Sequence, residues 1–171
     1  MLSIRRENFI IRPWQAEDAQ SLAAEANNVK IWNNLHDSFP HPYREEDARE
    51  YIGRVSGQWP LTDFAIVVDG NAVGGIGLTP GRDVERFSAE IGYWIGESYW
   101  NRGIVTQVVN AFAEYLISST NIVRLFALVY ENNPSSARVL EKAGFRRAGI
   151  LRKAAFKNNR FLNIHYYERT F

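Results

Sequence analysis

The sequence has no cysteine, almost no net charge and no long apolar segment, and each absence narrows its possible functions. Without cysteine there is no disulfide framework, no thiolate nucleophile and no cysteine-ligated metal. A formal net charge of +1 gives no reason to expect a nucleic acid as partner. No run long enough to span a membrane occurs, and the first residues lack the apolar core of a signal peptide. We therefore expect a cytoplasmic protein that does not bind membranes.

Histidine is also scarce. The three histidines show no zinc-ligand spacing, so no metal is expected; they are His36, His41 and His165. In contrast, 46% of the 171 residues are hydrophobic and 13% are aromatic, which is enough for a sizeable core. We expect one domain over residues 1–171. The sequence leaves the oligomeric state open, a homodimer included.

Apolar periodicity predicts an α+β protein built on one mixed, mostly antiparallel sheet flanked by helices. About seven strands are expected, at residues 9–14, 64–68, 72–78, 87–95, 122–130, 150–156 and 161–169. Residues 122–130 are apolar at nearly every position, as in a central strand covered on both faces. Helices are expected at residues 16–27, 44–55, 104–117 and 134–142. The stretch from Val29 to Tyr43 is expected to be irregular, since its prolines exclude a continuing helix.

A short turn with an arginine and a glycine joins the strand that ends at Ile95 to the helix that begins at Ile104. A helix N-terminus exposes unpaired N–H groups at the positive end of its dipole, so it suits an anion such as phosphate. Gly103 would let a ligand approach the backbone closely, and Arg102 would add donors. Taken alone, the stretch favours an ordinary strand–turn–helix over an anion site, because one glycine and one arginine are common in turns.

A second helix begins after the next strand. Asn133 stands at the N-cap and Pro134 at the first helical position, and both residues are favoured there. Gly144 follows as the C-cap glycine. Two helices would thus each follow a neighbouring parallel strand with exposed polar groups at their starts. Ligands of α/β sheets bind at such openings.

These motifs, in this order and spacing, resemble the GNAT superfamily of acyl-CoA-dependent N-acetyltransferases, and most closely its RimJ/RimL-type ribosomal-protein branch. The resemblance covers essentially the whole chain. Its motifs are Phe9-Ile-Ile-Arg-Pro, Glu90-Ile-Gly-Tyr-Trp-Ile, Tyr99-Trp-Asn-Arg-Gly103, Asn133-Pro-Ser-Ser136, Val-Leu-Glu-Lys-Ala-Gly-Phe145 and Gly149-Ile-Leu-Arg-Lys153. The resemblance implies a splayed sheet that holds acetyl-CoA, and transfer of its acetyl group to a primary amine of a protein, a peptide or a small molecule.

The resemblance also implies which residues hold the cofactor. The backbone of Trp94, Ile95 and Gly96 is expected to pair with the pantetheine arm. The pyrophosphate is expected against Asn101, Arg102, Gly103, Ile104, Val105 and Thr106. Asn133 is expected to bind the pantetheine or thioester region, and Arg138 and Lys142 are expected to reach the phosphates. Val105 departs from the family pattern, because a smaller residue is usual there.

Two residues are candidates for the chemistry. An amine attacks a thioester only as the free base, and Glu90 is the candidate general base. The alternatives for Glu90 are a structural hydrogen bond or orientation of the substrate ammonium. Many members of the superfamily have a tyrosine where this chain has Leu140, so Ser136 is the candidate that protonates the departing thiolate. As the N3 residue of a capped helix, Ser136 also suits a purely structural role. A backbone N–H near Ile95 would stabilise the oxyanion.

The sequence indicates the residues that bind the acceptor amine less clearly than those that bind the cofactor. The aromatic stretch from Val29 to Tyr43 is expected to form a substrate wall, with Trp32, His36 and Tyr43 as candidate contacts, although each could instead be a core residue. The sequence does not identify the amine. A rival interpretation is a catalytically silent acyl-CoA-binding sensor or interaction module. A general nucleotide-binding protein lacks support, because neither a P-loop nor a G-x-G-x-x-G motif is present.

Overall fold

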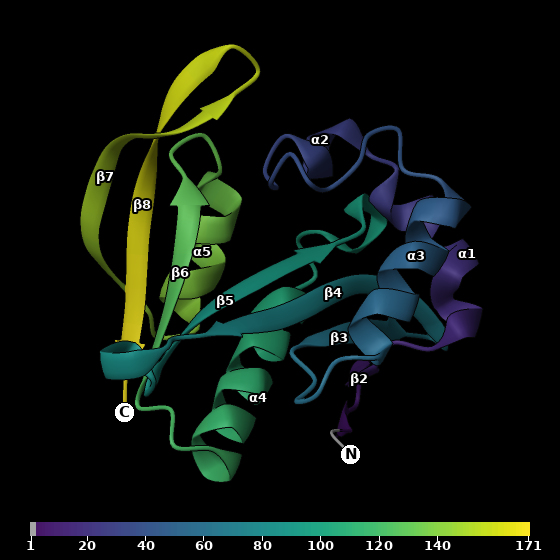
Figure 1. Cartoon of the computed structure of the whole chain (residues 1–171), viewed down its shortest axis with the longest axis horizontal. Helices are drawn as coiled ribbons and strands as arrows, with labels where there is room; N and C mark the ends of the chain where they lie inside the picture. Colours follow the sequence, from purple (N-terminus) through teal and green to yellow (C-terminus); the bar gives the residue numbers. More distant parts are fainter. Residues whose placement is uncertain (1–2) are drawn as a thin grey trace. The chain divides into compact units, whose positions relative to one another are not determined.

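The computed structural model describes residues 3–171, in which eight strands form one sheet flanked by helices (Figure 1). The strands are β1 (Ile4–Arg6), β2 (Phe9–Pro13), β3 (Asp63–Val68), β4 (Asn71–Pro80), β5 (Ser88–Ile95), β6 (Arg124–Tyr130), β7 (Arg146–Lys157) and β8 (Arg160–Thr170). The α-helices are α1 (Ala19–Ala26), α2 (Val29–Trp32), α3 (Glu45–Ser56), α4 (Ile104–Ser119) and α5 (Pro134–Lys142). Short 3₁₀ helices are η1 (Ala16–Asp18), η2 (Asp83–Glu85) and η3 (Glu97–Tyr99).

The strand order is β1-β2-β3-β4-β5-β6-β8-β7. The pairing of β5 with β6 is parallel, whereas β1–β2, β2–β3, β3–β4, β6–β8 and β7–β8 pair antiparallel. The predicted mixed sheet is therefore confirmed. The chain divides into two compact units, described separately below. The first unit contains the residues up to Gly77 and Tyr93–Val108, and the second contains Leu78–Gly92 and Val109–Phe171.

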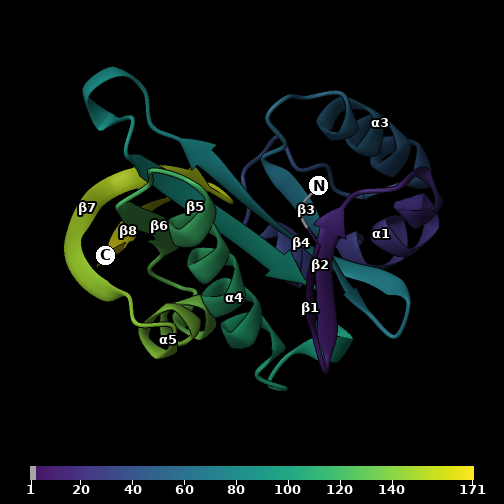
Figure 2. The same cartoon turned by 90° about the horizontal axis from the view of Figure 1, so that it is seen from below.

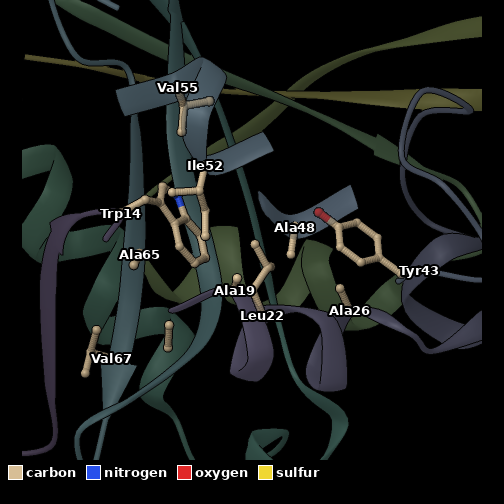
Figure 3. Close-up of a cluster of buried hydrophobic side chains, with 11 residues drawn as sticks. Trp14, Ala19, Leu22, Ala26, Tyr43, Ala48, Ile52, Val55, Ala65 and Val67 are labelled. Atoms are coloured by element: carbon tan, nitrogen blue, oxygen red, sulfur yellow. The ribbon is translucent and has the colours of Figure 1, made fainter. Parts of the chain in front are cut away.

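In the first unit, α1 and α3 lie side by side and share one apolar cluster with the sheet (Figures 1 and 2). Figure 3 shows the Trp14 ring next to Ile52, with Leu22 below them. The cluster consists of Trp14, Ala19, Leu22, Ala26, Tyr43, Ala48, Ile52, Val55, Ala65, Val67 and Ala72. Small residues on α1 let the neighbouring helix approach, and burial of the larger side chains supplies the driving force for packing.

Carboxylates stabilise the starts of η1 and α3 in this unit. Asp18 is buried and accepts from the backbone N–H of Gln15 at 2.9 Å and from both terminal nitrogens of Arg12 at 2.7 Å. The predicted helix at residues 16–27 therefore starts as the 3₁₀ turn η1 and becomes α1 only at Ala19. At α3, the Asp47 carboxylate accepts from the N–H of Arg44 at 2.7 Å, as an acidic residue in a first turn should.

In the second unit, β6 lies between β5 and β8 in the strand order. Alternate residues of β6 are buried, namely Leu125, Ala127 and Val129. The prediction that both faces of this strand are covered was too strong. On the other face Phe126 is only half-buried and stacks on Tyr166 of β8, with ring centroids 5.2 Å apart. The apolar run reflects this aromatic packing rather than complete burial.

Two short elements were missing from the sequence-based expectation. β1 pairs with β2 through Ile4↔Ile11 and Arg6↔Phe9, which raises the strand number from about seven to eight. The segment expected to be irregular opens with α2, and the Asn28 side chain caps it by accepting from the N–H of Lys30 at 2.8 Å. Three and four residues are too few to show a periodic pattern. No helix within residues 3–171 is both long and apolar enough to cross a membrane.

Two glycines bring β4 close to the end of β5 within the first unit. A side chain at Gly74 would overlap the carbonyl oxygen of Trp94 and lie 2.9 Å from Cα of Ile95. A side chain at Gly75 would lie 3.0 Å from Nε1 of Trp94. The position of the Trp94–Ile95 backbone therefore depends on the absence of a side chain at Gly74, and the position of the Trp94 indole depends on the absence of one at Gly75.

We expect Gly74→Ala to destabilise the protein by about 1–3 kcal/mol, because backbone atoms must move to admit the methyl group. Gly53→Ala is the matched control, since nothing lies within 4 Å of that added carbon on α3. There, alanine should stabilise the helix by roughly 0.5–1 kcal/mol. Denaturant unfolding of both variants measures the difference. Equal stability of Gly74→Ala and wild type would contradict the steric role of Gly74.

Candidate functional site

The loop that leaves β5 is fixed by its own hydrogen bonds. Trp100 donates from Nε1 to the carbonyl oxygen of Ile95 at 2.9 Å, and the N–H of Tyr99 donates to Gly96 at 3.0 Å, which closes η3. Trp100 is the second residue of the motif Tyr99-Trp-Asn-Arg-Gly103. Its indole therefore ties the loop back onto the strand that precedes it, a structural task that its position in the motif alone did not reveal.

The start of α4 forms the predicted donor cluster. Asn101 and Gly103 both adopt positive φ angles, 60° and 73°, which turns the chain sharply into the helix. The first regular backbone bond of the helix runs from the N–H of Gln107 to Gly103. By helix geometry, the N–H groups of residues 104–106 precede this ladder and have no acceptor within it. A side chain at Gly103 would meet nothing within 4 Å, so the backbone here faces open space.

A positive side chain, Arg102, stands just before α4. The Arg102 guanidinium lies 5.4 Å from the centre of the Tyr99 ring and is exposed. Together with the helix dipole, it favours an anion at the start of α4. Ile104 is buried and anchors the helix, whereas Val105 and Thr106 are half-buried.

The backbone at the end of β5 has a defined orientation. The N–H of Gly96 donates to the carbonyl of Val73 on β4 at 2.8 Å. In a trans peptide the preceding carbonyl points the opposite way, so the Ile95 carbonyl points away from β4, where Trp100 binds it. The N–H and C=O of one strand residue point to the same side, which directs the Ile95 N–H away from β4 as well. The Trp94 side chain is half-buried and packs against Phe39 and the first-unit core.

In the second unit, Glu90 marks the end of the β5–β6 pairing. The parallel register runs from Ser88↔Arg124 through Ala89↔Leu125 to Glu90↔Phe126. Both strands continue past this pair within the described part of the chain. Glu90 is half-buried, while its neighbours Ala89 and Ile91 are buried on the opposite face. On the neighbouring strands, Glu90 pairs with Phe126 of β6, and Phe126 pairs with Glu168 of β8.

The helix α5 carries the other predicted residues of this unit. The Asn133 side chain caps the helix by accepting from the N–H of Ser136 at 3.1 Å, as predicted. The cap uses one lone pair of Oδ1, which leaves the second lone pair and the Nδ2 hydrogens for a ligand contact. Ser136 is half-buried in the first turn. Arg138 is exposed and contacts Ser135 at 3.2 Å, and Lys142 is exposed in the last turn.

The aromatic segment before α3 divides into surface and core residues. Trp32 is half-buried and stacks on His41, with ring centroids 5.6 Å apart, and His36 is exposed. Tyr43 is only 5% exposed, packs on Phe39 and belongs to the cluster in Figure 3. Burial raises the pKa of Tyr43 to about 12. Its ring thus supports the segment from within the core.

The structure therefore distributes the predicted residues over the two units. One continuous segment of the first unit, residues 94–106, contains the strand end, the tied loop and the helix start. The second unit contains Glu90 on β5 and the N-terminal residues of α5. Among residues 3–171 no group of three or more His, Cys, Asp or Glu side chains is arranged to hold a metal ion.

Sequence comparison agrees with this interpretation. Residues 8–146 match the family of acetyltransferase (GNAT) domains. The uncharacterized N-acetyltransferase p20 of Bacillus licheniformis is 24% identical over 170 residues, which cover 98% of this chain and 95% of that protein. The ribosomal-protein-serine acetyltransferase of Escherichia coli K12 is 33% identical over 82 residues, which cover 48% of this chain and 46% of that protein.

Solved structures share the fold. Mycobacterium smegmatis RimJ, solved in complex with a CoA disulfide, superposes with a TM-score of 0.83 at 21% sequence identity. The alignment covers 95% of this chain and 81% of RimJ. The predicted fold and the RimJ/RimL-type resemblance are thus confirmed by independent comparisons.

The open space at Gly103 leads to a test of the donor cluster. Gly103→Val should weaken acetyl-CoA binding about tenfold or more, because a side chain would occupy the space in front of the helix N-terminus. Gly70→Val is the matched control: Gly70 also has a positive φ, 83°, and also faces open space, but lies in the β3–β4 turn. Both variants carry a similar backbone strain of roughly 1–2 kcal/mol. Calorimetric titration that finds the same affinity for both would argue against a cofactor at Gly103.

Proposed function

The chain belongs to the GNAT acetyltransferase family and is an acetyl-CoA-dependent N-acetyltransferase; we propose that it acetylates the primary amine of a protein or peptide N-terminus. The acceptor is suggested by the ribosomal-protein-serine acetyltransferase of Escherichia coli, to which half of the chain is related. We further propose that residues 1–171 act as one acetyltransferase domain, because the family match includes residues of both units.

The start of α4 is the observation that supports cofactor binding most directly. It offers consecutive N–H donors, a positive dipole end and the Arg102 guanidinium, while Gly103 leaves the approach open. We assign the pyrophosphate to residues 101–106 and the pantetheine arm to the backbone at Trp94–Gly96. Asn133, Arg138 and Lys142 of α5 are assigned to the rest of the cofactor. When bound, acetyl-CoA supplies an activated thioester.

Three groups of this chain have proposed roles in the transfer. Glu90 accepts a proton from the acceptor ammonium, directly or through water, so that the neutral amine can attack the thioester carbonyl. The N–H of Ile95, which points away from β4, stabilises the oxyanion that forms as the C–N bond is made. The C–S bond then breaks, Ser136 donates a proton to the departing thiolate, and the second proton lost by the attacking nitrogen restores the Ser136 hydroxyl. The amide product retains the acetyl group and coenzyme A leaves as the thiol.

The acceptor is proposed to contact the segment of residues 29–43. The candidate contacts are the half-buried Trp32 and the exposed His36, whereas Tyr43 acts from the core by holding Phe39 in place.

The second candidate function is a sensor that binds acetyl-CoA without catalysis. The donor cluster at α4 serves both functions equally, so turnover is what separates them.

We expect saturating acetyl-CoA to raise the free energy of unfolding by about 2.7 kcal/mol at a hundred times its Kd. We also expect coenzyme A thiol to be released when peptides beginning with serine or alanine are added. A thiol reagent measures this release, and a panel of small amines serves as the comparison. A folded protein whose melting temperature does not respond to acetyl-CoA would contradict the cofactor assignment. A clear thermal response without thiol release from any amine would favour the sensor.

Glu90→Gln tests the proposed base. The variant should keep its affinity for acetyl-CoA, while kcat should fall on the order of a hundredfold and the rising limb of the pH–rate profile should shift upward. If Glu90 only orients the ammonium, KM should rise with kcat nearly constant. If it is structural, the variant should melt earlier with near-normal kinetics. Glu85→Gln, an exposed carboxylate of the same unit, controls for the loss of charge.

A further inference from the structure

A second carboxylate contacts the strand end assigned to acetyl-CoA. Glu25 projects from α1 onto Gly96, where an added side chain would overlap Oε2 of the Glu25 carboxylate. Both residues belong to the first unit. The space that a Gly96 side chain would take is thus filled by the Glu25 carboxylate. Nothing in the local sequence distinguishes Glu25 from an ordinary glutamate of an exposed helix face.

No positively charged side chain pairs with the Glu25 carboxylate among residues 3–171. Glu25 is half-buried, and its carboxylate also has no hydrogen bond in that part of the chain. Burial alone raises its pKa. The neighbouring carboxylate, Glu97, is fully engaged: Asn28 donates to it at 2.8 Å and Lys30 forms an ion pair with it. A partly buried, uncompensated carboxylate is costly, and a cation brought by a ligand removes that cost.

We propose that Glu25 binds the ammonium group of the acceptor amine beside Gly96. This inference rests on the proposed function, because Gly96 matters to the acceptor only if its backbone borders the thioester. Glu25 then has a different task from Glu90. It selects and holds the cationic form of the acceptor by charge and hydrogen bonding, and the removal of the proton is left to another group. The substrate class that follows is an alkyl amine protonated at neutral pH, rather than a neutral aromatic amine.

The probes are a hexapeptide that begins with serine and its N,N,N-trimethylated analogue, which carries the cation but cannot be acetylated. Glu25→Gln should raise KM for the peptide about tenfold or more, the range expected for a lost charged hydrogen bond, with kcat within about threefold. It should also weaken binding of the analogue to the CoA-loaded protein, measured calorimetrically, but by a smaller factor, because the trimethylammonium group keeps the charge and donates no hydrogen bond. Affinity for acetyl-CoA should not change. Glu25→Asp should recover part of both losses.

Glu50→Gln is the control, because Glu50 is an exposed carboxylate on α3 of the same unit. Unchanged KM and analogue affinity in Glu25→Gln would overturn the inference. So would a fall in kcat at constant KM, which indicates a base, or a loss of acetyl-CoA affinity, which indicates support of the loop. If wild type releases no thiol with any amine, the proposed function fails, and titration with the analogue still decides the role of Glu25.

Discussion

The close approach of β4 to the end of β5 is the constraint on which the cofactor side of the molecule depends. Gly74 removes a side chain that would push the Trp94–Ile95 backbone away from β4, and Gly75 leaves room for the Trp94 indole. The short N–H···O bond from Gly96 to Val73 then fixes the direction of the peptide that follows Ile95. Trp100 uses the opposite side of that peptide to secure the loop. The absence of a side chain at Gly74 thus determines the direction of the Ile95 N–H. It also determines the point from which the chain enters α4.

The sequence predicted most of the long elements because their signals are local. Asn133, Pro134 and Gly144 mark the ends of α5, and the structure shows the Asn133 cap and a φ of 79° at Gly144. The turn at Asp69–Gly70 has two positive φ angles, 49° and 83°, as expected for a tight hairpin. Such signals act within a few residues, so they can be read without knowing the fold. β1 and α2 were missed because three and four residues are too few to show a repeating apolar pattern.

The parts that could not be predicted depend on contacts between distant segments. Glu25 and Gly96 are far apart in the sequence, and neither residue type indicates the other. The partial exposure of Phe126 likewise depends on Tyr166, which lies forty positions later. Tyr43 could be assigned to the core only once α1, α3 and β3 were seen to enclose it. The chemistry of a polar or aromatic side chain is known from its residue type, but its burial and its partners depend on the fold.

The two substrates are recognised by different kinds of group. The groups assigned to acetyl-CoA are mostly backbone N–H groups at a strand end and a helix start, which any sequence with this fold provides if its glycines are kept. The groups assigned to the acceptor are side chains: Glu25, Trp32 and His36. Backbone donors tolerate wide sequence change, whereas a side-chain contact is lost with a single substitution. The fold and the cofactor can therefore persist among distant relatives while the acceptor changes, and acceptor specificity should be sought in α1 and residues 29–43.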